Sequence, residues 1–401
     1  MSSIPAEALA TASRPAEREE TLTRAPFRIE SIDALRGFVI LLMALDHVRS
    51  YFTNATFDPL DLTQTNVALY VTRWATHLCA PTFIFLAGVS AYLMAQRLEV
   101  SQLRRFLITR GLWLVALEFT VVQLAWSFNL RYENGLFLQV IWAIGASMIV
   151  LGAIVSWPRW LLASIAVAMI AGHNVLDGIQ PESFGRLDWV WLLLHQKAET
   201  QYAFILYPLV PWIGVMILGF CAGSVFELDA ARRRTVLLAA GGAALIAFVA
   251  LRALNVYGDP HPWTVQPTAT LTVLSFFNVY KYPPSLAYLL ATLGIGVLLL
   301  AAFESLRGKP LEFLRAFGRV PLFVYVLHIV LAHFAAGLLA LAMGFGDQVL
   351  TNLFIYPPEG WGFGLVGVYI AWLAVIAALY PACRWFARVK RTRNDWWLAY
   401  L

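Results

Sequence analysis

The sequence carries little charge. Only 13% of its 401 residues are Asp, Glu, Lys or Arg, and 60% are hydrophobic, whereas soluble domains average about 25% charged and about 45–50% apolar residues. This shortage excludes an ordinary soluble fold. The net charge of +5 does not indicate a nucleic acid partner, because the basic residues stand between apolar runs and do not line one polar face. The chain is predicted to be a membrane protein.

Cysteine is equally scarce. Cys79, Cys221 and Cys383 lie in or beside apolar runs, without a CxxC pair or a metal-ligand spacing. Neither a disulfide framework nor a zinc site is therefore implied, and we expect no metal cofactor.

Long polar segments and internal repeats are also missing, so a single membrane domain is predicted over residues 29–390. Residues 1–28 are rich in Ser, Ala, Glu, Arg and Pro and have no apolar core. They are predicted to form a disordered cytoplasmic tail and not a cleaved signal peptide. Residues 391–401 are expected to form an interfacial C-terminal segment.

Long apolar runs are what the sequence has in abundance. Crossing about 30 Å of hydrocarbon takes roughly 20 residues in a helix, and runs of about this length predict an all-α, polytopic membrane helix bundle of about ten transmembrane helices. The predicted spans are 34–52, 77–96, 106–125, 136–156, 159–176, 203–226, 235–256, 284–303, 319–343 and 361–385.

Basic residues favour one orientation of this bundle. With both the N-terminus and the C-terminus in the cytoplasm, 22 of the 29 Lys and Arg residues fall on the cytoplasmic side, as the positive-inside rule requires. The expected location is the inner (plasma) membrane of the cell. Two longer outer loops, 177–202 and 257–283, mix polar and aromatic residues, which fits either interfacial amphipathic segments or a lid over an outward-facing site.

The first span contains titratable residues. His47 follows Arg36 by eleven residues, which places both on one helix face about 16 Å apart. Arg36 is predicted to hold an anion at the cytoplasmic surface, and the imidazole of His47 to accept or donate a proton within the bundle. Asp46 is its neighbour. Charged residues in a span are costly and usually functional, although a structural hydrogen bond is the simpler alternative for His47.

Two further polar residues lie at comparable depth. Glu118 and His328 are expected roughly 18 and 12 Å from the cytoplasmic surface, against about 16 Å for His47. They are therefore predicted to converge with His47 on one cavity. The alternative for Glu118 is a neutral hydrogen bond between packed helices.

Two predicted helix starts carry basic residues. Arg319 precedes Pro321, and Pro in the first turn is a helix start signal. The positive end of this helix beside an arginine predicts a phosphate site on the cytoplasmic side. The alternative is an ordinary positive residue that anchors the helix end at the membrane surface. On the outer side, Asn278 and Lys281 lie in "NVYKYPPSL" just before the eighth span, where they could hold a polar acceptor.

Five stretches together carry a family resemblance: "SIDALRGFVILLMALDHVRSYF", "THLCAPTFIFLAGVSAYL", "LLHQKAETQYAFILYPLVPWIGVMILGF", "SFFNVYKYPPSLAYLLATLG" and "FGRVPLFVYVLHIVLAH". Over residues 29–385 the chain resembles a bacterial member of the heparan-alpha-glucosaminide N-acetyltransferase (catalytic domain) family, within the wider transmembrane acyltransferase superfamily. The resemblance implies transfer of an acetyl group from cytoplasmic acetyl-CoA to a sugar or other envelope acceptor across the membrane.

The resemblance also bears on single residues. His47 stands where the wider superfamily has a candidate catalytic His. The similar lysosomal enzyme has Asn there and a proposed catalytic His in the loop after the first span, but this sequence has no His between Tyr51 and Thr76. His77 is the nearest residue that could substitute for it.

The complete prediction is an acetyl-CoA-dependent acyltransferase. His47 is the expected general base, supported by Asp46, Glu118 and His328. CoA phosphates are expected at Arg36, Arg105 and Arg319, and the acceptor at His77, Asn278, Lys281 and Tyr282. Expected partners are acetyl-CoA, a glycan acceptor and membrane lipids, and a homodimer is left open. The alternative function is a transporter or flippase for an envelope lipid or sugar that uses the same residues as a proton relay.

Overall fold

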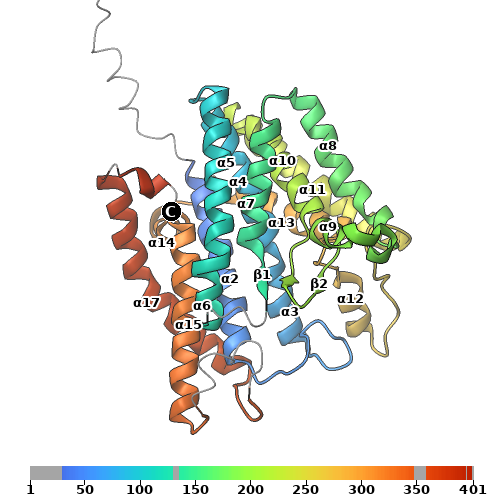
Figure 1. Ribbon diagram of the computed structural model, residues 1–401, viewed down its shortest axis with the longest axis vertical. Coiled ribbons are helices and arrows are strands. Elements are labelled where there is room, and N and C mark those ends of the chain that lie inside the picture. The colour runs from blue at the N-terminus through green and yellow to red at the C-terminus, as the bar shows by residue number, and fades with distance from the viewer. Residues whose placement is uncertain (1–28, 130–134, 347–357, 394, 400–401) are drawn as a thin grey trace, which may run out of the picture.

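The computed structural model describes residues 29–129, 135–346, 358–393 and 395–399. These residues form a bundle of long helices, so the predicted all-α fold class is confirmed (Figure 1). The predicted tail, residues 1–28, lies outside the described residues. The long helices are α2 (Glu30–Phe52), α3 (Val67–Ala75) with α4 (Cys79–Ala95), α5 (Val100–Leu117), α7 (Val140–Ile154), α8 (Arg159–Gly172), α10 (Leu209–Ala222), α11 (Ala230–Leu254), α13 (Leu286–Phe303), α15 (Pro321–Ala342) and α17 (Leu365–Thr392).

Each of the ten predicted spans corresponds to one of these helices. Within the described residues, eight helical stretches are long and apolar enough to cross a membrane. The two others are α2, which contains five charged residues, and α7, which has only 15 residues. Pro321 opens α15 as predicted.

Two of the spans that begin later than predicted are preceded by strands. Instead of continuing the helices, β1 (Leu136–Leu138) pairs in parallel with β3 (Ala203–Ile205), and β3 pairs antiparallel with β2 (Ala198–Glu199). Gly135 has a positive φ of 73°, and Pro208 stands at the N-cap of α10. Both residues favour chain reversal or helix initiation over helix continuation, so the apolar residues before α7 and α10 form strands.

Short helices connect the spans. They are η1 (Thr76–Leu78), a π-helical turn η2 (Glu118–Val122) followed by α6 (Gln123–Ser127), η3 (His173–Leu176), η4 (Pro181–Leu187), α9 (Asp188–Leu194), η5 (Gly223–Glu227), α12 (Ala269–Phe277), α14 (Gly308–Gly318) and η6 (Trp396–Ala399). The amphipathic helix α14 packs on α2 and was not among the predicted elements, because its eleven residues are too short to register as a span.

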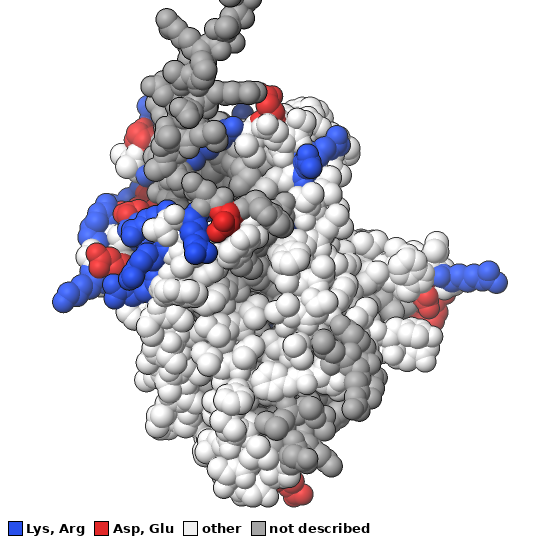
Figure 2. Space-filling view, turned by 60° about the vertical axis from the view of Figure 1, so that its left-hand side comes forward, with Lys and Arg blue, Asp and Glu red and all other residues white. Residues whose placement is uncertain are grey.

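The start of α2 and the end of α17 lie at the same end of the bundle, which we call the N-terminal end (Figure 1). Lys and Arg side chains gather towards that end, and a broad surface below them is almost free of charge (Figure 2). An uncharged belt of this kind suits contact with lipid.

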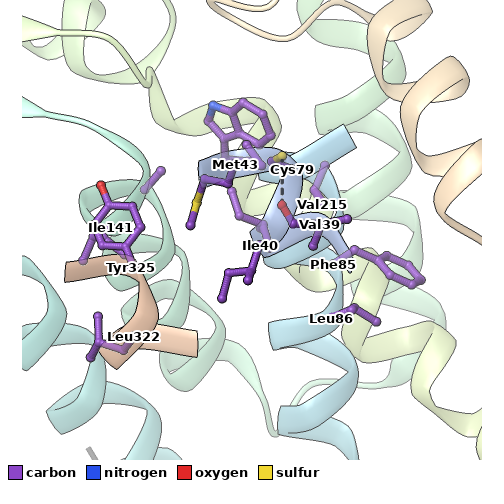
Figure 3. Close-up of a cluster of buried hydrophobic side chains, with 14 of the residues drawn as sticks. Val39, Ile40, Met43, Cys79, Phe85, Leu86, Ile141, Val215, Leu322 and Tyr325 are labelled. Atoms are coloured by element: carbon purple, nitrogen blue, oxygen red, sulfur yellow. Dashed lines mark hydrogen bonds between the residues drawn. The ribbon is translucent and has the colours of Figure 1, made fainter. Parts of the chain in front are cut away.

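Close helix contacts hold the centre of the bundle together. At the crossing of α4 and α10, a methyl group on Gly88 would overlap the carbonyl of Met216, and one on Gly219 would overlap the carbonyl of Phe85. Glycine at both positions therefore lets the two backbones touch, as is common between membrane helices. Around α2 the core is apolar, and the thiol of Cys79 reaches the backbone carbonyl of Val39 at 3.2 Å (Figure 3).

Candidate functional site

His47 and His328 form a direct pair in the middle of the bundle. His47 lies on α2 and His328 on α15, and the distance from His47 Nδ1 to His328 Nε2 is 2.7 Å. The two rings are nearly parallel, with an interplanar angle of 12° and centroids 4.9 Å apart. The structure therefore brings together two of the residues that the sequence placed at similar depth.

The partners of His328 determine which nitrogen carries each proton. His328 Nδ1 lies 2.7 Å from the carbonyl oxygen of Val324, and a carbonyl can only accept a hydrogen bond. In the neutral ring, His328 Nε2 is then the acceptor, so His47 Nδ1 donates to it. This arrangement leaves His47 Nε2 with a free lone pair, which is the atom that a general base needs.

His328 is fully buried, but His47 is only partly buried. Aromatic rings flank His47: Trp126 of α6 lies edge-on with centroids 4.7 Å apart, and Tyr325 of α15 lies edge-on at 6.1 Å. The hydroxyl of Tyr325 is buried and makes no hydrogen bond of good geometry with a described residue. A polar reactant beside His47 would have that hydroxyl available as a donor.

The carboxylate of Asp46 lies between two arginine side chains. Its Oδ1 lies 3.0 Å from Arg49, and its Oδ2 lies 3.6 Å from Arg73 of α3. The adjacent carboxylate is therefore occupied by two arginines, and the partner that orients His47 is His328.

Lys281 and Tyr282 lie near the charged side chains of Asp46 and Arg73. The ammonium of Lys281 is buried and lies 5.0 Å from the ring centre of Tyr282 and 5.9 Å from that of Tyr207. Burial alone would raise the pKa of Tyr282, but the positive charges of Lys281 and Arg73 lower it below the ordinary value for tyrosine. Burial and the neighbouring Tyr282 raise the pKa of Tyr207.

The other two predicted acceptor residues have structural contacts. His77 is fully buried, its ring packs against Tyr288 with centroids 5.2 Å apart, and its backbone carbonyl accepts from the Tyr288 hydroxyl at 2.8 Å. The side chain of Asn278 donates to the carbonyl of Leu60 at 3.2 Å. Asn278 therefore holds the loop that follows α2.

Glu118 is placed at a helix start and not against His47. Its Oε2 accepts a hydrogen bond of 2.7 Å from the backbone N–H of Trp142, in the first turn of α7. Gln139, the N-cap of α7, makes no side-chain cap bond. Glu118 thus satisfies a backbone donor that would otherwise be unpaired inside the bundle.

Arg36 and Arg319 meet at the N-terminal end of the bundle through Asp33. Asp33 Oδ1 lies 3.7 Å from Arg36, and Asp33 Oδ2 lies 4.0 Å from Arg319. Arg36 also donates to the carbonyl of Leu86 at 3.2 Å and to the hydroxyl of Ser90 on α4. Arg105 is not part of this group: it is exposed on α5, which packs mainly on α7.

Apolar residues separate the two ends of the predicted site. Ile40 and Met43 share the helix face of Arg36 and His47, and they are 0% and 7% exposed. Figure 3 shows them packed among side chains of neighbouring helices, with Tyr325 and Leu322 of α15 nearby. A long ligand lying along this face of α2 would have to move the Met43 side chain.

Sequence reasoning missed Asp33, Arg73 and the rings around His47. Asp33 stands one helical turn before Arg36, and this i,i+3 spacing is the signal that could have identified it. Arg73 and Trp126 belong to other helices, and no local spacing in the sequence relates them to His47.

The family model for heparan-alpha-glucosaminide N-acetyltransferase, catalytic, matches residues 28–259, more than half of the chain. The match includes α2 with His47 and ends before Lys281 and Tyr282 and before α15, which carries His328. No curated protein matches the chain. With a membrane helix bundle and a match of this extent, the chain belongs to the heparan-alpha-glucosaminide N-acetyltransferase catalytic domain family.

Proposed function

We propose that the protein transfers an acetyl group from cytoplasmic acetyl-CoA to a hydroxyl or amine of a sugar or other envelope acceptor on the far side of the membrane. Membership of an acetyltransferase family supports the reaction class. The observation that carries the chemistry is the 2.7 Å contact between His47 and His328, which leaves His47 Nε2 free to accept a proton.

In the proposed reaction, His47 Nε2 takes the proton from the acceptor O–H or N–H as the acceptor atom attacks the thioester carbonyl carbon. A C–O or C–N bond forms, and the tetrahedral intermediate expels the CoA thiolate by breaking the C–S bond. The proton on His47 then passes to the thiolate, so the base is regenerated. His328 holds the ring in the required tautomer, and the buried Tyr325 hydroxyl is the proposed donor for the developing oxyanion.

The donor is proposed to enter from the N-terminal end of the bundle, where its phosphates would contact Arg36 and Arg319. Eleven residues of α2, about 16 Å, separate Arg36 from His47, a span that suits the long arm of CoA. The arm would follow Ile40 and Met43, and the flexible Met43 side chain can repack to admit it. The acceptor would approach from the side of Lys281 and Tyr282.

The test is incubation of purified protein in lipid vesicles with radiolabelled acetyl-CoA and a panel of envelope sugars. The expected result is labelled sugar that depends on both reactants, with an equal amount of free CoA thiol released. A transporter or flippase would instead move a labelled sugar or lipid between leaflets without acetyl-CoA. Sugar movement with no acetylated product would overturn the proposal.

A further inference from the structure

A group of metal-ligating side chains lies away from the His47 pair. His173, Asp177 and His195 each offer one ligand atom, and the three atoms lie within 4.8 Å of one another. His173 lies in η3 just after α8, and His195 is the residue that ends α9. The cluster thus brings the start of η3 next to the C-terminal end of α9.

The two histidines are buried without good partners. His173 and His195 are 2% and 3% exposed. No nitrogen of either ring makes a hydrogen bond of good geometry with a described residue, and the one ion-pair contact of either ring with a described residue joins His195 to Asp177. Buried polar groups are nearly always satisfied, and leaving one unpaired costs about 1–3 kcal/mol. Two such rings facing one carboxylate indicate a ligand that is shared by all three.

Asp177 is already held in a suitable orientation. Its Oδ2 accepts a 2.8 Å hydrogen bond from the side-chain amide of Asn174, whose own oxygen accepts from the backbone N–H of Leu286 at 2.9 Å. Oδ1 is then left for the cluster, and it lies 3.2 Å from His195 Nε2. Two ligands on one tetrahedral zinc ion are separated by about 3.4 Å, given metal–ligand distances near 2.1 Å.

We propose that His173, Asp177 and His195 bind one zinc ion, or a divalent transition metal of similar preference. Two imidazoles and one carboxylate form a ligand set typical of zinc, whereas Mg²⁺ and Ca²⁺ require mainly oxygen ligands. No cysteine takes part, which is why the cysteine spacing in the sequence indicated no metal.

Zinc binding is expected to hold the loop between α8 and α10 in one conformation. The metal would tie the end of α8 to the end of α9, and Lys197 follows His195 by two residues, with its ammonium 5.9 Å from the ring centre of Tyr282. Zinc would therefore order the segment that covers the Lys281 and Tyr282 side of the bundle. The proposal does not depend on the acetyltransferase reaction.

The experiment uses the full chain in lipid nanodiscs, stripped with a chelator, incubated with Zn²⁺ and then desalted. Elemental analysis is expected to find about one zinc per chain in the wild type. His195→Gln, which keeps the side-chain volume and a polar atom, should reduce retained zinc at least about tenfold. His261→Gln is the matched control, because His261 is an exposed outer-loop histidine outside the cluster, and it should retain zinc as the wild type does.

Thermal unfolding gives the second readout. Zn²⁺ should raise the Tm of the wild type and of His261→Gln but not that of His195→Gln, and Mg²⁺ should raise none of them. Should His195→Gln fail to fold, Co²⁺ added to stripped wild type must produce the intense visible absorption of a tetrahedral site. Equal zinc retention in wild type and His195→Gln, or a wild type without cobalt absorption, would overturn the proposal.

Discussion

The pair formed by His47 and His328 concentrates the proposed chemistry on one nitrogen atom. Since the Val324 carbonyl accepts from His328 and His328 accepts from His47, each ring fixes the proton position of the next. The tautomer of the base is thus defined by a chain of contacts that ends on the backbone of α15. This differs from a histidine oriented by a carboxylate, because no charge is placed beside the ring by its partner.

Substitution of either histidine tests this view. His47→Ala and His47→Gln should both lower the acetyl-transfer rate roughly 10²-fold or more, because neither side chain can accept the proton at neutral pH. Binding of CoA should change little. Single-turnover rates and CoA titrations measure the two effects separately.

His328→Ala should give a smaller loss of rate than His47→Ala, with KM unchanged, because the base would remain but its tautomer would be free. His333→Gln is the control, since His333 lies on the same helix and its Nδ1 contacts the backbone of Ala125. An active, folded His47→Gln protein would contradict the role of His47.

The arginines around Asp33 give a second prediction at this scale. Arg36→Ala combined with Arg319→Ala should weaken CoA binding by at least about tenfold while leaving sugar binding unaffected, because charge-assisted contacts to phosphate contribute about 1.5–3 kcal/mol each. Calorimetric titration with CoA measures the effect. Arg105→Ala is the control, because Arg105 is exposed on α5, away from Asp33. Unchanged affinity in the double variant would remove the arginines from the donor site.

At the scale of the elements, α7 depends on a side chain from another helix. It has only 15 residues, and its first turn is capped by Glu118 at the π-helical turn after α5. A short helix with an unpaired N–H group inside the bundle would be unstable. Glu118 is therefore expected to contribute to folding and not to proton transfer.

Glu118→Ala should lower stability by about 0.5–2 kcal/mol, the usual range for loss of a helix cap. Glu118→Gln should retain both stability and acetyl transfer, because its amide oxygen still accepts from Trp142. Thermal unfolding and rate measurements on both variants check this. A Gln variant with normal Tm and lost activity would restore a chemical role to the carboxylate.

The crossing of α4 and α10 gives a second test at the scale of the elements. Gly88→Ala should destabilise the protein by about 1–3 kcal/mol, because the added methyl would force the backbone of Met216 away. Gly242→Ala on α11 is the matched control: nothing lies within 4 Å of the added methyl, so higher helix propensity should leave stability unchanged or improved. Thermal unfolding in one detergent compares them, and equal Tm values for the two variants would contradict the close contact.

At the scale of the whole molecule, orientation in the membrane is the principal prediction. The predicted orientation puts 22 of the 29 basic residues on the cytoplasmic side. A cysteine at Arg234 should then be protected from an impermeant thiol reagent in intact cells, and a cysteine at Ser183 should react. Cys79 and Cys383 are buried, and Cys221 is half-buried, so background labelling should be low. Labelling at position 234 from outside would reverse the orientation.

The sequence predicted the helices well because each span had to be long and apolar, which is a local property. It was less successful where the chain leaves the helical pattern. The residues of β1 and β3 are as apolar as the helices that follow them, and Gly135 and Pro208 are the local signals that interrupt the pattern. The arrangement of the candidate site residues was predicted in part. The i,i+11 relation of Arg36 and His47 is contained in one helix, whereas contacts such as Asp46 with Arg73 depend on how separate helices pack.

The carboxylate of Asp33, shared by Arg36 and Arg319, also has a consequence for turnover. Under the proposed reaction, donor and spent product carry the same phosphates, so a strong phosphate grip would retain the product as firmly as it captures the donor. The carboxylate of Asp33 competes with phosphate for both arginines, so it weakens the binding of acetyl-CoA and of CoA to the same extent. Asp33 would then act as a built-in competitor that speeds departure of CoA, the step that often limits enzymes with a tightly held cosubstrate.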